Sequence, residues 1–194
     1  HNNGYVPPNT YLGDIVYWTV TSFGYRFNHI HLNILAAGDV YLNTMEFHTP
    51  LADTQKPEIQ QIGLYNGTTL LSGNSISGSY GLYVRARDLF LSTVYYLPPY
   101  KIAFSLDGGP LTTVWDFHNL PGGASDTTFV NDFYVAPPTD GDYSIRDFVI
   151  DLGFTTSGQR SFPTTPGLHE ITVTIWDYNG NTDTKTYYWI VTCG

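Results

Sequence analysis

Turn-forming residues interrupt this sequence at intervals of about ten residues, and no segment between them has a helical pattern. Apolar residues alternate with polar ones or form short runs, which is typical of strands in sheets. Gly, Pro, Asn and Asp at the interruptions favour tight turns. We therefore predict an all-β fold with strands at residues 11–21, 28–35, 40–47, 58–65, 81–87, 100–106, 111–117, 128–135, 144–152, 169–177 and 184–192.

The composition supports sheets and restricts the possible partners. Of the 194 residues, 42% are hydrophobic and 16% aromatic, which suits a packed β core and excludes a disordered chain. The formal net charge is -9 and no basic run is present, so we expect no nucleic-acid partner. No long apolar segment predicts a membrane span. Only 13% of residues are charged, and the many Thr, Ser, Asn and Tyr residues indicate a secreted or cell-surface protein.

The two ends of the sequence suggest how the chain is made. It begins at His1 and not at Met, so we expect a processed product. Cys193 is the only cysteine, which excludes an internal disulfide. Its thiol either bonds to another chain or has no role.

The last two predicted strands form the clearest structural unit. Asn179-Gly180 lies between them, and this pair favours a hairpin because both residues tolerate positive φ. The oxygen-bearing residues 177–183 also suggest a calcium loop, but Gly180 is in the wrong position for a twelve-residue loop, so we prefer the hairpin. One face of the first strand should be core (Ile171, Val173, Ile175) and the other should not (Thr172, Thr174, Trp176). This ending resembles the last hairpin of bacterial immunoglobulin-like modules.

A pair of histidines carries the strongest chemical signal. In the segment Asn28-His29-Ile30-His31-Leu32-Asn33, a strand would place His29, His31 and Asn33 on one face. The two histidines would then lie roughly 6.5 Å apart along the chain. One imidazole can bind a metal while the other handles a proton, so the pair is a candidate catalytic site.

This motif resembles that of lysostaphin-type zinc endopeptidases, which cut peptide cross-links in peptidoglycan and carry His-x-His on a strand. The resemblance implies that His31 binds zinc and that His29 assists catalysis as a base or by stabilising the transition state. The stretch from Val6 to Gly13 also resembles the family's sequence before the motif. Residues 52–57, Ala-Asp-Thr-Gln-Lys-Pro, resemble the linker that precedes a β-sandwich in some of these enzymes. We therefore expect a partial peptidase sheet over 1–52 and an immunoglobulin-like β-sandwich with long insertions over 53–194.

The departures from the family predict an incomplete enzyme. Catalytic zinc normally has three protein ligands, and the family's His-x-x-x-Asp ligand motif is not found upstream of His29. Zinc should therefore bind weakly or not at all. We expect an extracellular binding protein, with peptidoglycan or a cell-surface glycan as possible partner, or a subunit that self-associates through sheet edges. The alternative is an active zinc endopeptidase whose catalytic first half precedes this sequence.

The remaining candidate residues favour structural roles. We expect isolated surface or loop positions for three histidines: His48, His118 and His169. An acidic stretch should be a solvated face or a weak calcium site: Asp140, Asp142, Asp147 and Asp151. Most of the four tryptophans should be core, although such rings can also stack on sugars: Trp18, Trp115, Trp176 and Trp189.

Overall fold

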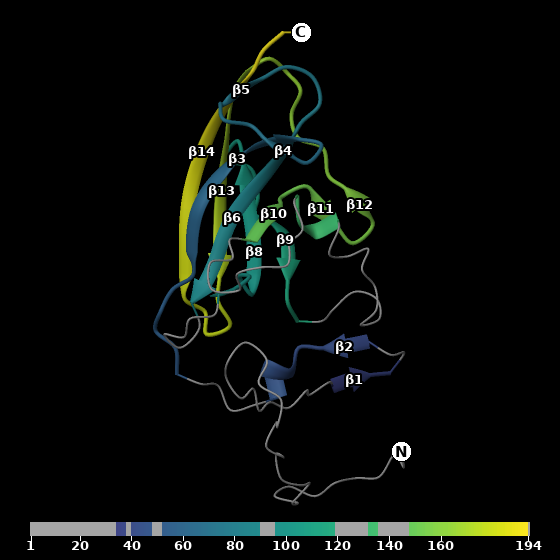
Figure 1. Cartoon of the computed structure of the whole chain (residues 1–194), viewed down its shortest axis with the longest axis vertical. Helices are drawn as coiled ribbons and strands as arrows, with labels where there is room; N and C mark the ends of the chain where they lie inside the picture. Colours follow the sequence, from purple (N-terminus) through teal and green to yellow (C-terminus); the bar gives the residue numbers. More distant parts are fainter. Residues whose placement is uncertain are drawn as a thin grey trace, which may run out of the picture. The chain divides into compact units, whose positions relative to one another are not determined.

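A computed structural model describes residues 34–37, 40–47, 52–89, 96–118, 132–135 and 148–193 (Figure 1). All of them belong to one compact unit, Ile34–Gly194. The predicted strand at 11–21 and most of the one at 28–35 lie outside the described residues. In the described part of the chain, no helix is long and apolar enough to cross a bilayer.

The first large sheet is antiparallel and has the strand order β10-β6-β3-β4. Its long central strands are β3 (Glu58–Asn66) and β6 (Gly81–Leu89). The outer strands are β10 (Phe148–Asp151) and the short β4 (Thr69–Leu70). Strand β7 (Tyr96–Leu97) pairs with the end of β6.

The second large sheet has the order β5-β14-β13-β8-β9. Its centre is the hairpin of β13 (Gly167–Trp176) and β14 (Thr182–Val191). Strand β8 (Lys101–Leu106) pairs antiparallel with β13, and β9 (Thr112–Asp116) pairs antiparallel with β8. Strand β5 (Ser75–Ile76) pairs with β14 in parallel.

Two small hairpins and one short helix complete the described elements. Strands β1 (Ile34–Ala36) and β2 (Val40–Leu42) pair with each other and lead into the 3-10 helix η1 (Thr44–Phe47). Strands β11 (Phe154–Thr155) and β12 (Gly158–Gln159) form the second hairpin.

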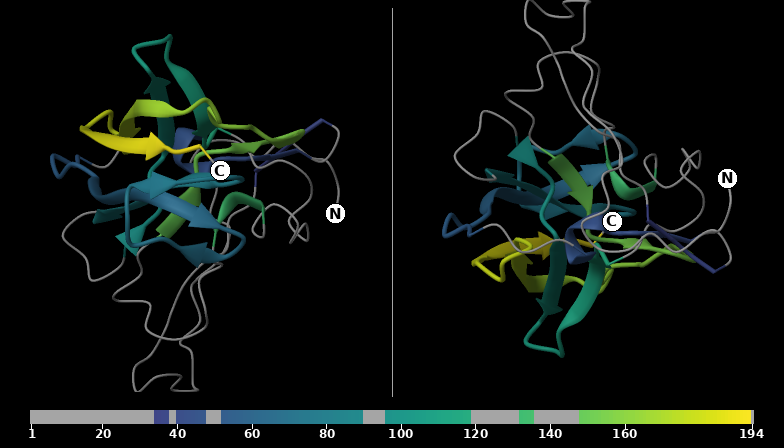
Figure 2. Two further views of the ribbon diagram at one scale, coloured as in Figure 1. Left: turned by 90° about the horizontal axis from the view of Figure 1, so that it is seen from above. Right: turned by 90° about the horizontal axis from the view of Figure 1, so that it is seen from below.

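One hydrophobic core lies between the two large sheets, which form opposite layers around it (Figure 2). In β13 the predicted inner face, Ile171, Val173 and Ile175, is fully buried. The outer positions Thr172 and Thr174 pair with threonines of β14 through hydroxyl hydrogen bonds of 2.9 and 3.0 Å. The all-β prediction is therefore confirmed, whereas the immunoglobulin-like type of the sandwich stays a prediction.

The two sheets are joined along one side by contacts between β3 and β14. The backbone N–H of Ile59 donates to Oδ2 of Asp183 at 2.9 Å, and the backbone carbonyl of Ile59 accepts a bond from Nζ of Lys185. A bulge between Ile59 and Gln61 interrupts the pairing of β3 with β6. Side chains of β14 thus satisfy backbone groups at the edge of β3, which no β ladder covers at this position.

Glycine and tyrosine alternate across the pairing of β3 with β6. Gly63 lies opposite Tyr83, and Gly81 lies opposite Tyr65. A methyl group at Gly63 would lie 2.8 Å from the Tyr83 hydroxyl, and one at Gly81 would overlap the Tyr65 ring. Each glycine therefore leaves room for the ring on the neighbouring strand, so both positions require the absence of a side chain.

Two predicted strands differ from the structure. The strand predicted at 40–47 ends at Leu42, because Asn43 caps the helix η1: its Oδ1 accepts the Met45 N–H at 3.0 Å. The described part of the strand predicted at 128–135 holds a helical turn and one β-bridge, from Tyr134 to Ile150. The other predicted strands between residues 58 and 192 are confirmed within a few residues.

The turn between β13 and β14 confirms the predicted hairpin, with one correction. Only Gly180 has a positive φ, 88°, so Asn179 does not use the freedom expected of it. Asp177 fixes the turn by accepting the Asn181 backbone N–H on Oδ1 at 2.7 Å. The Asp177 backbone N–H also donates to the Asn181 carbonyl at 3.0 Å. The turn is thus closed by backbone and side-chain bonds of Asp177, with one left-handed residue in place of two.

Candidate functional site

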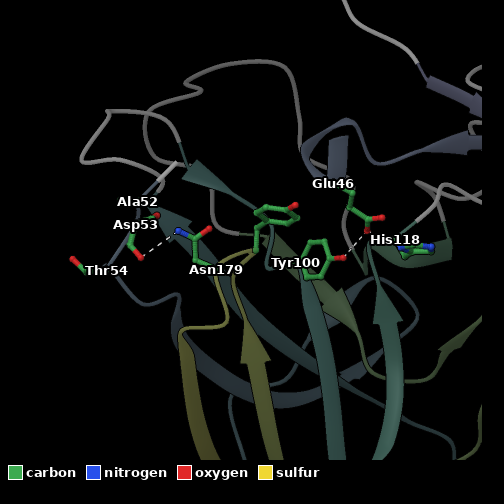
Figure 3. Close-up of a pocket in the computed structure, with 8 residues that line it drawn as sticks. Glu46, Ala52, Asp53, Thr54, Tyr100, His118 and Asn179 are labelled. Atoms are coloured by element: carbon green, nitrogen blue, oxygen red, sulfur yellow. Dashed lines mark hydrogen bonds and ion pairs between the residues drawn. The ribbon is translucent and has the colours of Figure 1, made fainter. Parts of the chain in front are cut away.

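A groove of about 650 Å³ lies at the end of the unit where the β13–β14 turn is found (Figure 3). Four segments far apart in the sequence supply its walls: η1, the segment before β3, the start of β8 with the end of β9, and the β13–β14 turn. Its lining consists of Glu46, Ala52, Asp53, Thr54, Tyr100, His118, Tyr178 and Asn179.

Asn43 positions one wall of the groove. Its Nδ2 donates to the Phe117 carbonyl at 2.8 Å, and its backbone N–H donates to the His118 carbonyl at 3.0 Å. These bonds hold the start of η1 against the residues that follow β9. The same asparagine caps η1, so the helix begins beside His118. The carboxylate of Glu46, which lies in this helix, therefore reaches the His118 imidazole.

Glu46 accepts two hydrogen bonds on one oxygen. The Tyr100 hydroxyl donates to Oε1 at 2.9 Å, and Nδ1 of His118 lies 2.6 Å from the same atom. Because the carboxylate can only accept, Nδ1 of His118 carries the proton. Burial raises the pKa of Tyr100, and its hydrogen bond to Glu46 raises it further, so the phenol stays protonated. The His118 side chain is 64% exposed and therefore faces solvent at the rim.

Two tyrosine rings form the floor between the walls. Tyr178 meets Tyr100 edge to face, with centroids 5.4 Å apart and planes at 78°. The Tyr178 hydroxyl donates to the Met45 carbonyl at 2.7 Å. The turn that carries Tyr178 is thus attached to η1, which fixes the spacing between the rings and the Glu46 carboxylate.

The opposite wall is the segment before β3. Nδ2 of Asn181 donates to the carbonyls of Asp53 and Gln55 at 3.1 and 3.3 Å, and Nδ2 of Asn179 donates to the Asp53 carbonyl at 3.3 Å. Figure 3 shows Ala52, Asp53 and Thr54 on this side, facing the wall that carries Glu46 and His118. The β13–β14 turn is therefore hydrogen-bonded to both walls of the groove.

The lining of the groove combines two phenol rings, two carboxylates, an imidazole, an amide and the hydroxyl of Thr54. Among the described residues, no three His, Cys, Asp or Glu side chains are arranged to hold a metal ion. Flat rings beside planar hydrogen-bonding groups fix the orientation of a polar ligand.

The predicted zinc ligand His31 and the predicted assisting residue His29 lie outside the described residues, as does His48. His118 is exposed as predicted, but it is not isolated, because it pairs with Glu46. No spacing in the sequence connects these two residues, which are 72 positions apart.

His169 is also not isolated. Its Nδ1 lies 2.8 Å from Oδ2 of Asp107, and its Nε2 lies 3.0 Å from the Thr165 carbonyl. Both partners are acceptors, so the doubly protonated ring fits best, and the bond to Thr165 followed by that to Asp107 raises the pKa of His169. The ring stacks on Trp189 with centroids 5.5 Å apart, so this histidine has a structural role.

The predicted acidic face is described only at Asp151, where the prediction is wrong. Asp151 is 2% exposed because the outer face of β10 is covered by a small cluster of Tyr83, Val135 and Val149. Its Oδ1 accepts the Gly153 N–H at 2.8 Å. Burial raises its pKa, although this hydrogen bond opposes the rise. Asp140, Asp142 and Asp147 lie outside the described residues.

Two tryptophans confirm the expectation of core positions. Trp115 and Trp189 are 5% and 0% exposed. Trp176 is partly buried, and Nζ of Lys101 lies 5.7 Å from its ring centroid. Trp18 lies outside the described residues. None of the three described tryptophans lines the groove.

Comparisons with known proteins gave no relative: no family model matches the sequence, and neither the curated proteins nor the solved structures yielded a match.

Proposed function

We propose that this chain is an extracellular binding protein that recognises a glycan, with peptidoglycan as the first candidate. The observation that carries the proposal is the groove in which Tyr100 and Tyr178 lie beside Glu46 and His118. Sugar rings offer apolar C–H faces to aromatic rings and hydroxyl groups to carboxylate, imidazole and amide groups. In the groove, the aromatic rings of the floor lie beside the hydrogen-bonding groups of one wall, so both kinds of partner for a sugar are present.

The charges at the groove favour a neutral or amino-bearing sugar over an anionic one. Glu46 and Asp53 are acidic, and no Lys or Arg is among the lining residues. The net charge of -9 also disfavours anionic ligands, and it acts over longer distances. Secretion is supported by the low content of charged residues and by the hydroxyl groups that β13 and β14 display, such as the Thr172–Thr186 and Thr174–Thr184 pairs.

In this proposal, residues 1–52 derive from a lysostaphin-type peptidase and no longer complete a zinc site within this chain. The motif at His29 and His31 supports descent from such an enzyme. The immunoglobulin-like part, 53–194, then supplies most of the binding groove.

A substitution at Glu46 tests the groove. We expect Glu46→Gln to reduce co-sedimentation of the protein with purified peptidoglycan at least about tenfold, because the amide removes the charge and a hydrogen bond to a charged group contributes about 1.5–3 kcal/mol. Glu58→Gln is the control: the Glu58 carboxylate is likewise paired with a side chain, Arg87 at 3.0 Å, but it lies outside the groove. Equal binding by both variants and the unchanged protein would reject the groove as the binding site.

The second candidate function is zinc-dependent cleavage of peptidoglycan, favoured by His29 and His31 two residues apart. Zinc would polarise the scissile carbonyl and activate water, with the remaining ligands provided by sequence upstream. Release of soluble peptides from peptidoglycan by this chain joined to such upstream sequence, abolished by a chelator, would support this candidate against the first.

The third candidate function is a structural role, in which copies of this chain associate with one another. Three exposed apolar side chains gather on the outer face of the β13–β14 hairpin: Leu168 pairs with Ile190, and Tyr188 lies two residues before Ile190. Measuring the size of the protein in solution at increasing concentration tests this role, since a constant monomer size would count against a self-assembling subunit.

A further inference from the structure

A second pocket, of about 360 Å³, lies at the end of the unit opposite to the groove, where β3 and β10 end and β6 and β13 begin. One of its walls belongs to the strap, which we define as residues 160–166 between β12 and β13. The strap contributes four residues to the lining: Arg160, Ser161, Phe162 and Thr164. The width of this pocket therefore depends on where the strap is held.

Two hydrogen bonds hold residues 161–166 to other side chains in the part of the chain that the structure describes. The Tyr80 hydroxyl donates to the Pro163 carbonyl, and Nε2 of His169 lies 3.0 Å from the Thr165 carbonyl. Between them, the buried Phe162 packs against Phe104 with ring centroids 6.0 Å apart. The end of the strap at Thr165 therefore depends on His169.

A neutral imidazole cannot make both bonds of His169. Its Nδ1 faces Oδ2 of Asp107 at 2.8 Å and its Nε2 faces the Thr165 carbonyl, and both partners only accept. Asp107 is fixed in place, because its Oδ1 accepts the Glu170 N–H at 2.9 Å. A neutral ring keeps its proton on Nδ1, since a hydrogen bond to a charged acceptor is the stronger one. Nε2 then turns a lone pair toward the Thr165 carbonyl, and the two repel each other.

Asp107 is the charged group that acts on the His169 imidazole. The Arg160 guanidinium lies over the Phe104 ring, 5.4 Å from its centroid, and donates to the Leu152 carbonyl at 3.2 Å. Burial raises the pKa of two nearby phenols, which therefore stay neutral: Tyr80 before β6 and Tyr187 on β14. On β13 itself, Glu170 contacts Asp107 through its backbone.

We propose that His169 is a pH-operated clasp: with both ring nitrogens protonated it fastens the strap at Thr165, and loss of one proton releases the strap and opens the second pocket. The bond to Thr165, followed by that to Asp107, raises the pKa of His169 above the usual 6.5. The clasp is therefore closed in acid and opens as pH rises through the folded-state value. It does not depend on the proposed glycan.

An NMR titration of the full chain tests the clasp. The His169 ring should titrate above pH 6.5, and the same midpoint should appear in the amide shifts of Ser161, Phe162, Thr164 and Thr165. In Asp107→Asn the midpoint should fall toward 6.5, because the carboxylate that attracts the second proton is gone. Asp116→Asn is the control, since Asp116 pairs with Lys101 and not with a histidine, and it should leave the midpoint unchanged. A His169 midpoint below 6.5, or strap amides that do not follow it, would overturn the proposal.

His169→Gln measures what the clasp contributes to stability, because glutamine does not titrate. A raised folded-state pKa contributes stability that is fully present below the unfolded value and is lost as pH rises through the folded value. Relative to this variant, we expect the Tm of the unchanged protein to fall by about 2–4 °C from pH ~6 to pH ~9. A difference in Tm that stays constant over this range would contradict the clasp. Should His169→Gln fail to fold, Asp107→Asn replaces it in the same comparison.

Discussion

Replacing Trp189 by Ala is expected to remove about 3–5 kcal/mol from the free energy of unfolding. The Trp189 side chain is fully buried, stacks on His169 and Tyr187 with centroids 5.5 and 6.3 Å apart, and donates its Nε1–H to the Tyr80 hydroxyl at 3.0 Å. The Tyr80 hydroxyl in turn bonds to the Pro163 carbonyl. The substitution therefore creates a cavity and leaves a partly buried hydroxyl with one partner fewer.

Urea unfolding followed by circular dichroism measures this loss. A domain of this kind has a total stability of about 5–15 kcal/mol, so the variant should unfold at a much lower urea concentration or not fold at all. The neighbouring Tyr188→Ala is the control: that ring is 51% exposed, and its removal should change stability by only about 0.5 kcal/mol. Similar losses for both variants would contradict the position of the core.

Asp183→Ala is expected to cost about 2–3 kcal/mol at neutral pH. Asp183 accepts the Ile59 N–H at 2.9 Å and a bond from Nζ of Lys56 at 3.2 Å, and Lys185 lies beside it on β14. Without the carboxylate, a backbone N–H at the edge of β3 loses its only acceptor on this side, and β3 loses its attachment to β14. Asp183→Asn keeps an acceptor oxygen, so it should cost less.

The cost of Asp183→Ala should also depend on pH. Burial alone would raise the pKa of Asp183, but the Ile59 N–H and the Lys56 and Lys185 charges outweigh it and hold the folded-state pKa below the usual 3.8. A lowered pKa contributes stability above the unfolded value that disappears as pH falls through the folded value. Urea unfolding at pH 7 and below pH 3.8 should therefore show a smaller difference between the two proteins in acid; an equal difference would contradict the role of the charge.

Much of the sheet framework could be predicted from the sequence, because burial on one face of a strand leaves a local pattern. The alternation at Ile171, Val173 and Ile175 gave both the strand and its inner face. The Asn179-Gly180 pair located the hairpin, although only Gly180 takes the left-handed conformation. The short strands β4, β5, β7, β11 and β12 are too brief to leave a period, so they could not be predicted.

The groove could not be predicted, since its residues meet only in the folded chain. Glu46 was expected in a strand, and the asparagine cap that turns it into the helix η1 forms its other bonds with residues 117 and 118. His118 has no chemical neighbour in the sequence that would indicate a site. Asp88 at the end of β6 is likewise buried because other segments cover it, and no local sequence pattern indicates this burial.

The most direct test of glycan recognition is to map the amide chemical shifts of the labelled protein by NMR while a soluble peptidoglycan fragment, a disaccharide with its peptide stem, is added. Binding in the groove should shift the amides of Thr44–Phe47, Tyr100, His118 and Tyr178 in a saturable way. Absence of shifts at high fragment concentration, or shifts centred on Leu168, Tyr188 and Ile190 at the outer face of β13 and β14, would contradict the account.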